Sequence, residues 1–170
     1  MNNILPFSIG QVSTSTALEP LLGANYKVGA RLYRLVKATA AITTPARRGV
    51  VTAYASGIPS WSVDLPTAQA TLPPAGIIPI EYGSTTIALG SYFYVQIDGP
   101  ASALAAATAI LAGTAGAALF INTSGNVALF TAATDAMIVA AVNIGYASAS
   151  VGAVAVGSPL AIVLEGLGDA

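Results

Sequence analysis

The sequence contains no cysteine and no histidine among its 170 residues. Disulfide bridges, thiol chemistry and the usual zinc ligands are therefore excluded, as is the side chain that most often acts as a general base. The seven acidic residues are scattered singly, and Gly113–Gly116 lacks the lysine of a phosphate-binding loop. Glu81 and Asp98 would face each other, as glycoside hydrolysis requires, only if their strands paired. We expect no enzyme activity, no metal and no cofactor.

Charged residues are also scarce, at 8% of the chain against about 25% in an average protein. The net charge is −1, and the 55% of hydrophobic residues is dominated by 35 alanines rather than by large side chains. So small a net charge gives little repulsion between molecules. Either much of the surface lies against partner proteins or the chain tolerates being nearly neutral, and we expect the first.

Two stretches, residues 99–134 and 136–164, carry no charged side chain, and hydropathy alone would mark both as membrane spans. Glycine and asparagine interrupt them, neither contains about 20 consecutive strongly apolar residues, and no Lys or Arg flanks them to set an orientation. We expect no membrane partner, with a small membrane-inserted protein as a remote alternative.

Between Gly90 and Pro100 two sets of side chains alternate, one with Phe93, Val95 and Ile97 and the other with Tyr92, Tyr94, Gln96 and Asp98. Alternation of this kind, with aromatic and β-branched residues, predicts a half-buried strand that ends at Gly99-Pro100. We expect a core to form around this strand.

Further strands are predicted at 30–39, 48–55, 77–82, 101–111, 117–122, 127–131 and 160–164. Charges on both faces of 30–39 indicate an edge strand, and 117–122 and 127–131 form a hairpin across Thr123–Asn126. Short strands with a turn signal every 8–12 residues predict an all-β fold. The expected architecture is a compact β-sandwich or β-barrel of short antiparallel strands.

Residues 1–25 are predicted to be an extended N-terminal arm, and residues 26–170 a single β domain. The arm is either a frayed terminus or a segment that becomes ordered on a neighbouring subunit. Dense proline and glycine exclude a helix in 56–79 and predict a long ordered loop with at most short strands. Trp61 lies in this loop, either as a plug that pins it to the domain or as an anchor for a partner.

All six basic residues fall within positions 27–48, whereas residues 49–170 contain six acids and no base. This basic edge of two strands either keeps sheets from aggregating or docks on an acidic surface. Nucleic acid is not an expected partner, because the chain lacks a net positive charge and an aromatic platform. The candidate docking residues are Arg31, Arg34, Arg47, Arg48 and Trp61.

The stretch from Gly90 to Ala101, G-S-Y-F-Y-V-Q-I-D-G-P-A, resembles the G-x-Y-x-W-V-Q-x-x-G-P-A strand of head decoration (cement) proteins and related small structural proteins of tailed bacteriophages. Tyr94 stands where that pattern usually has tryptophan. Residues 31–38 are similar to the family's early strand, and 112–114, 119–127 and 144–147 follow its later pattern. The resemblance covers about residues 30–164.

The resemblance implies a small β-barrel or sandwich on the outer surface of an icosahedral capsid, commonly a homotrimer. There it would clamp neighbouring subunits of the major capsid protein together and stabilise the shell. The implied partners are therefore the major capsid protein and further copies of this chain, and the implied location is the outer surface of the virion. The alternative is another virion component, such as a tail or fibre-base protein.

Overall fold

A computed structural model describes residues 4–55, 58–66, 74–105, 118–121, 125–129, 145–148, 155, 157–165 and 167. Its elements in chain order are η1 (Thr16–Leu21), β1 (Asn25–Val28), β2 (Arg31–Ala38), β3 (Gly49–Ala55), β4 (Ile58–Asp64), β5 (Pro74–Ile77), η2 (Ile80–Tyr82), β6 (Tyr92–Leu104), β7 (Ala118–Ile121), β8 (Val127–Leu129), β9 (Gly145–Ala147) and β10 (Pro159–Leu164). The two η elements are short 3-10 helices. The predicted all-β class is confirmed.

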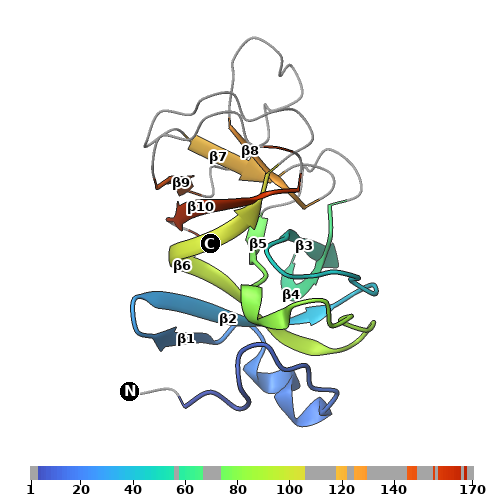
Figure 1. The fold of residues 1–170 in the computed structure, drawn as a ribbon. Coiled ribbons are helices and arrows are strands. Elements are labelled where there is room, and N and C mark those ends of the chain that lie inside the picture. The colour runs from blue at the N-terminus through green and yellow to red at the C-terminus, as the bar shows by residue number, and fades with distance from the viewer. Residues whose placement is uncertain are drawn as a thin grey trace.

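Five strands close a barrel in the order β2-β4-β3-β5-β6, and β6 pairs back onto β2 (Figure 1). The neighbouring pairs are antiparallel, except that β2 and β4 are parallel at Lys37–Ser62 and Ala38–Val63. Of the two predicted architectures, the barrel is the one adopted. Closure pairs both edges of each of these strands within the chain.

One prediction about the barrel strands is wrong. The prediction of an edge strand fails because β2 lies between β6 on one side and β1 and β4 on the other. The 56–79 segment, predicted as an ordered loop with at most short strands, supplies the short barrel strands β4 and β5. Pro59 and Pro74 stand at or beside the first residue of these strands, where a missing N–H removes little of the hydrogen-bond ladder.

Strand β6 belongs to both the barrel and a second sheet. Residues 92–98 pair with β2 and residues 99–104 pair with β10. The register shifts where Gln96 and Asp98 face consecutive residues of β2. Gly99 follows with a φ of +84°, and a Cβ added there would lie only 2.1 Å from the Ala30 carbonyl oxygen. The predicted strand end at Gly99-Pro100 is wrong, because β6 passes through the bulge at residues 96–98 and continues across the dipeptide, which pairs with β10.

The second sheet continues from β6 in the order β6-β10-β9-β7-β8 and lies above the barrel in Figure 1. Its β7–β8 pair confirms the predicted hairpin, and β10 confirms the predicted last strand. The strand expected at 77–82 is wrong, since Ile80–Tyr82 is the 3-10 helix η2. Of the strand expected at 101–111, residues 101–104 lie in β6 and 106–111 lie outside the described residues.

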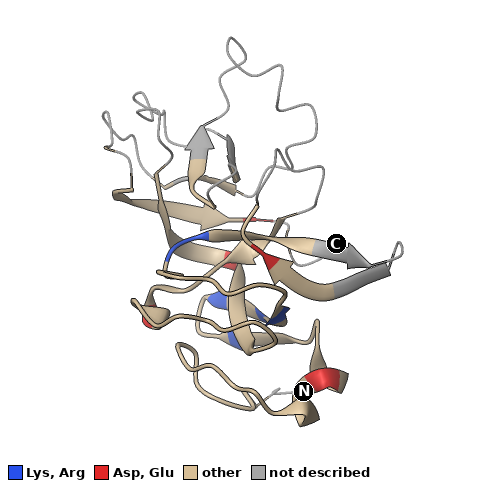
Figure 2. Ribbon diagram, turned by 90° about the vertical axis from the view of Figure 1, so that its right-hand side faces the viewer, with Lys and Arg blue, Asp and Glu red and all other residues tan. Residues whose placement is uncertain are grey.

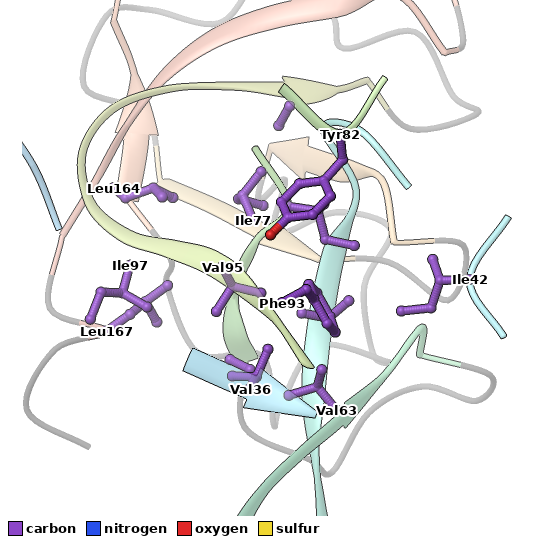
Figure 3. Close-up of a cluster of buried hydrophobic side chains, with 14 of the residues drawn as sticks. Val36, Ile42, Val63, Ile77, Tyr82, Phe93, Val95, Ile97, Leu164 and Leu167 are labelled. Atoms are coloured by element: carbon purple, nitrogen blue, oxygen red, sulfur yellow. The ribbon is translucent and has the colours of Figure 1, made fainter. Parts of the chain in front are cut away.

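Both faces of the first half of β6 are buried. Phe93, Val95 and Ile97 point into the main core, where the Tyr82 and Phe93 rings meet edge to face at 6.1 Å (Figure 3). Tyr92 and Tyr94 belong to a second cluster, whose other members are Leu18, Tyr26, Tyr33 and Leu35. The predicted alternation is confirmed, but the strand is not half-buried, because the N-terminal residues cover its outer face.

Residues 4–24, here called the N-terminal strap, lie against the barrel of their own chain (Figure 1). Ser13 and Tyr92 exchange two backbone hydrogen bonds of 3.0 and 2.8 Å, the Phe7 ring lies 4.7 Å from the Tyr94 ring, and Leu18 of η1 is buried. The predicted extended arm is thus a folded segment over these residues. Its apolar side chains gain more by covering the tyrosines than by remaining in water.

Candidate docking surface

The six basic residues lie on β1, on β2 and in the connection to β3, all in the barrel half of the molecule (Figure 2). They do not form the single edge expected from the sequence. Two of them pair with carboxylates of the chain, one is buried, and the remainder lie on the surface around the start of β3 and on β1.

Lys37 holds the N-terminal strap on the barrel. Its Nζ lies 2.9 Å from Oε2 of Glu19 in η1, and the Tyr92 hydroxyl donates a hydrogen bond to the same oxygen. These hydrogen bonds, first from Tyr92 and then from Lys37, lower the pKa of Glu19. The pKa values of Tyr92 and Lys37 are raised, in each case chiefly by the hydrogen bond with Glu19.

Arg34 and Trp61 form one structural unit. Arg34 is 3% exposed, its Nε donates to Asn25 Oδ1 at 3.0 Å, and its Cζ lies 4.2 Å from the centre of the Trp61 ring. The Trp61 ring also covers Gly23, where a Cβ would lie 2.1 Å from the indole Nε1. Trp61 therefore connects β4, β2 and the strap, which agrees with the interpretation of this residue as a plug.

Arg31 stands at the start of β2 with its side chain 40% exposed, and its NH1 lies 3.3 Å from Oε1 of Glu81 in η2. A hydrogen bond with Tyr33 is the largest cause that raises the pKa of the Arg31 guanidinium. Because the ion pair with Glu81 is exposed to water, we expect it to contribute little to stability. Arg31 remains accessible to a second acceptor.

Arg47 and Arg48 precede β3. The Arg47 Nε donates to Ser102 Oγ at 3.1 Å, and the Arg48 Nε donates to the Thr44 carbonyl at 3.2 Å. The Arg47 backbone has a φ of +66° and is fixed by hydrogen bonds of its N–H to Ile78 at 2.8 Å and of its carbonyl to the Leu104 N–H at 3.1 Å. The Arg47 side chain is thereby aimed at β6.

A pocket of about 150 Å³, here called the Arg31 pocket, opens between η2 and the second half of β6. Its polar lining comes from Arg31, Glu81, Gln96 and Ser102, and its apolar wall includes Ile80 and Pro100. Of the four predicted docking arginines, Arg31 lines this pocket, and Arg47 reaches it only through its hydrogen bond to Ser102. Arg34 does not, because it lies inward beside Trp61.

Sequence reasoning does not assign Glu81, Gln96 and Ser102 to the same site as Arg31. The sequence suggests Glu81 only as a partner for Asp98, whereas the structure pairs it with Arg31. A signal is present for Gln96, because it belongs to the V-Q-x-x-G-P-A pattern. No local pattern marks Ser102, which reaches the site only because β6 continues past Pro100.

Among the described residues, no group of three or more acidic side chains comes together as a metal site would require. The described residues contain no helix with the length and hydropathy of a membrane span.

No protein-family model matches the sequence, and comparison with curated proteins finds no match. Among solved structures, one similar chain comes from the crystal structure of the head fiber gp8.5 N base in bacteriophage phi29. The TM-score is 0.48 at 12% identity, over 79% of this chain and 94% of that chain. Neither the identity nor the score supports an inference about function.

Proposed function

We propose that this chain is a structural component of a tailed-phage virion that binds the outer surface of the assembled capsid and bridges neighbouring major capsid subunits. The observation that carries the proposal is that the motif residues in β6 are joined to one another by hydrogen bonds. The Gln96 Nε2 donates to the carbonyls of Asp98, Gly99 and Pro100 at 3.1, 3.4 and 2.8 Å. The resemblance to decoration proteins therefore rests on residues that together lock one bulge.

The structure of the barrel is compatible with a binding role. Side chains fill its interior (Figure 3), so a partner would contact the outer surface. We propose that the chain catalyses no reaction and that its copies assemble as homotrimers. A protein that binds only the assembled lattice stabilises it by RT ln(1 + [L]/Kd), and many copies act in parallel.

The basic residues are the proposed contacts with the capsid, chiefly Arg31, Arg47 and Arg48, while Arg34 and Trp61 support the barrel behind them. Complementary charge at an interface sets register and association rate, and its effect weakens with added salt. The double substitution Arg47→Glu and Arg48→Glu should therefore weaken attachment, with the fold retained as judged by circular dichroism.

The test uses the full-length protein and empty shells of the major capsid protein from the phage that encodes it. Sedimentation should give the mass of a trimer for the protein alone and should show that it co-sediments with the shells. In a separate thermal melt, decorated shells should melt at a higher temperature than bare shells. Binding to tail or fibre components in place of shells would contradict capsid bridging and support the alternative virion role. A monomer that binds none of these would contradict both.

A further inference from the structure

The Arg31 pocket presents hydrogen-bond donors on two sides. Arg31 lines one side, and its guanidinium is engaged through NH1 by Glu81. Ser102 lines the other side, and because its Oγ accepts a hydrogen bond from the Arg47 Nε, its own O–H proton is directed elsewhere. The lining itself holds one arginine, Arg31, and one carboxylate, Glu81, and the Arg47 guanidinium stands behind it on Ser102.

Arg47 is one of three described residues other than glycine with a positive φ, the others being Thr44 and Trp61. A φ of +66° is unfavourable for any residue with a Cβ and is most easily adopted by glycine. The two backbone hydrogen bonds of Arg47 to Ile78 and Leu104 impose this conformation, yet the position holds arginine. Residues kept in such conformations are concentrated at functional sites.

The size and lining of the pocket define its ligand. A volume of about 150 Å³ accommodates one side chain, and Ile80, which is 46% exposed, offers an apolar contact at the rim. A lining that contains a guanidinium and a hydroxyl donor is suited to a carboxylate, which accepts hydrogen bonds at both oxygens.

We infer that the Arg31 pocket accepts the carboxylate of an aspartate or glutamate side chain that projects from a partner protein. The inference rests on the proposed function, in which that partner is a capsid subunit. Glu81 is the internal competitor, since the incoming carboxylate takes over the guanidinium that Glu81 engages in the free protein.

The pocket is tested first without any shell. The probe is acetyl-Gly-Glu-Gly-amide, titrated into isotopically labelled full-length protein, with acetyl-Gly-Gln-Gly-amide as the neutral control. The Nε–H signals of Arg31 and Arg47 should shift with the glutamate peptide and not with the glutamine peptide, while that of the buried Arg34 stays in place. Equal shifts with both peptides, or none with either, would overturn the inference.

Substitutions then test the pocket on shells. Arg31→Gln and Arg47→Gly should each weaken attachment at least about tenfold, as expected for the loss of a charge-assisted hydrogen bond. Glu81→Gln should strengthen attachment by removing the competitor. Lys27→Gln, on the exposed part of β1, is the control of equal charge change and should leave attachment unchanged.

Arg47→Gly separates binding from folding, because glycine relieves the positive φ and should fold at least as well as arginine there. Weak attachment by this stable variant supports the inference. If Arg31→Gln and Arg47→Gly attach normally, the pocket is not the contact and the proposed function stands. If the glutamate peptide binds but the wild-type protein ignores shells, the proposed function fails and the pocket stands.

Discussion

Gly23 and Trp61 show how one missing side chain permits a contact between the strap and the barrel. The indole Nε1 would lie 2.1 Å from a Cβ at Gly23, whose φ is +82°. Gly29 has a similar conformation, with a φ of +59°, but no heavy atom lies within 4 Å of its Cβ position. A side chain at Gly29 would therefore carry only the cost of the backbone conformation, whereas a side chain at Gly23 would also clash with Trp61.

We predict that Gly23→Ala lowers the free energy of unfolding by roughly 2 kcal/mol more than Gly29→Ala does. Both substitutions place a Cβ on a left-handed residue, but only the first displaces Trp61 from Arg34. Urea denaturation measures the difference, and Trp61 fluorescence in the native state should change only in Gly23→Ala. Equal losses for the two variants would contradict the role assigned to Trp61.

The contact of Glu19 with Tyr92 and Lys37 makes docking of the strap depend on pH. The pKa of Glu19 is lowered in the folded protein from its usual value of 4.5, so the folded state holds this proton less tightly than the unfolded chain. The stabilisation is therefore complete above about pH 4.5 and is lost as the pH falls through the lowered pKa. The raised pKa values of Tyr92 and Lys37 predict a second loss at strongly alkaline pH.

The methyl signals of the buried Leu18 measure this docking. In the wild type these signals should broaden or shift as the pH falls below about 4.5. In Glu19→Gln this acid transition should be absent. Asp98→Asn, at an exposed carboxylate outside the strap, is the control and should keep the wild-type transition. An acid transition that survives in Glu19→Gln would show that another group controls the strap.

At the scale of the element, β6 depends on its bulge. One side-chain amide, that of Gln96, donates to three successive carbonyls, and Gln96 is 3% exposed. Those carbonyls lie where β6 passes from β2 to β10. The geometry of the bulge thus determines whether the barrel and the second sheet share one strand.

Gln96→Leu keeps the approximate volume but removes the donor. We predict a loss of roughly 1–3 kcal/mol in the free energy of unfolding, because three part-buried carbonyl hydrogen bonds lose their donor. Gln11→Leu, at an exposed residue of the strap, should change the value by less than about 0.5 kcal/mol. Urea denaturation of both variants is the measurement, and a Gln96→Leu protein of wild-type stability would contradict the locking role.

At the scale of the molecule, the barrel and the second sheet are joined by a common core. Leu160, Ile162 and Leu164 of β10 belong to the same cluster as Phe93 and Val95 of β6. We therefore expect the two parts to unfold together. The strap packs chiefly on the separate cluster that contains four tyrosines, and of its side chains Val12 packs against the main core.

Phe93→Ala should lower the free energy of unfolding by roughly 3–5 kcal/mol and speed hydrogen exchange of β2 and β10 amides equally. Phe7→Ala, which removes a ring from the strap, should speed exchange only at amides in contact with the strap, such as Ser13 and Tyr92. Hydrogen exchange followed by NMR measures both. Faster exchange in β2 than in β10 after Phe93→Ala would show that the sheets unfold separately.

Local patterns in the sequence determined the class of the fold. The alternation in 92–98, the turn residues between β7 and β8 and the apolar run of β10 each specify a strand through the positions of a few neighbouring residues. The absence of Cys and His and the scarcity of charged side chains likewise restrict the chemistry open to this chain. These inferences hold because period, turn chemistry and side-chain type act over short distances along the chain.

Tertiary structure decided the features that depend on residues far apart in the sequence. Whether Gly99-Pro100 ends β6 or bends it depends on Ala30 and β10, and whether β2 is an edge depends on β4 and β6. The strap is folded because it meets tyrosines from β1, β2 and β6. Likewise, Arg31 and Ser102 line one pocket only because barrel closure brings η2 and β6 together, and no spacing in the sequence encodes that distance.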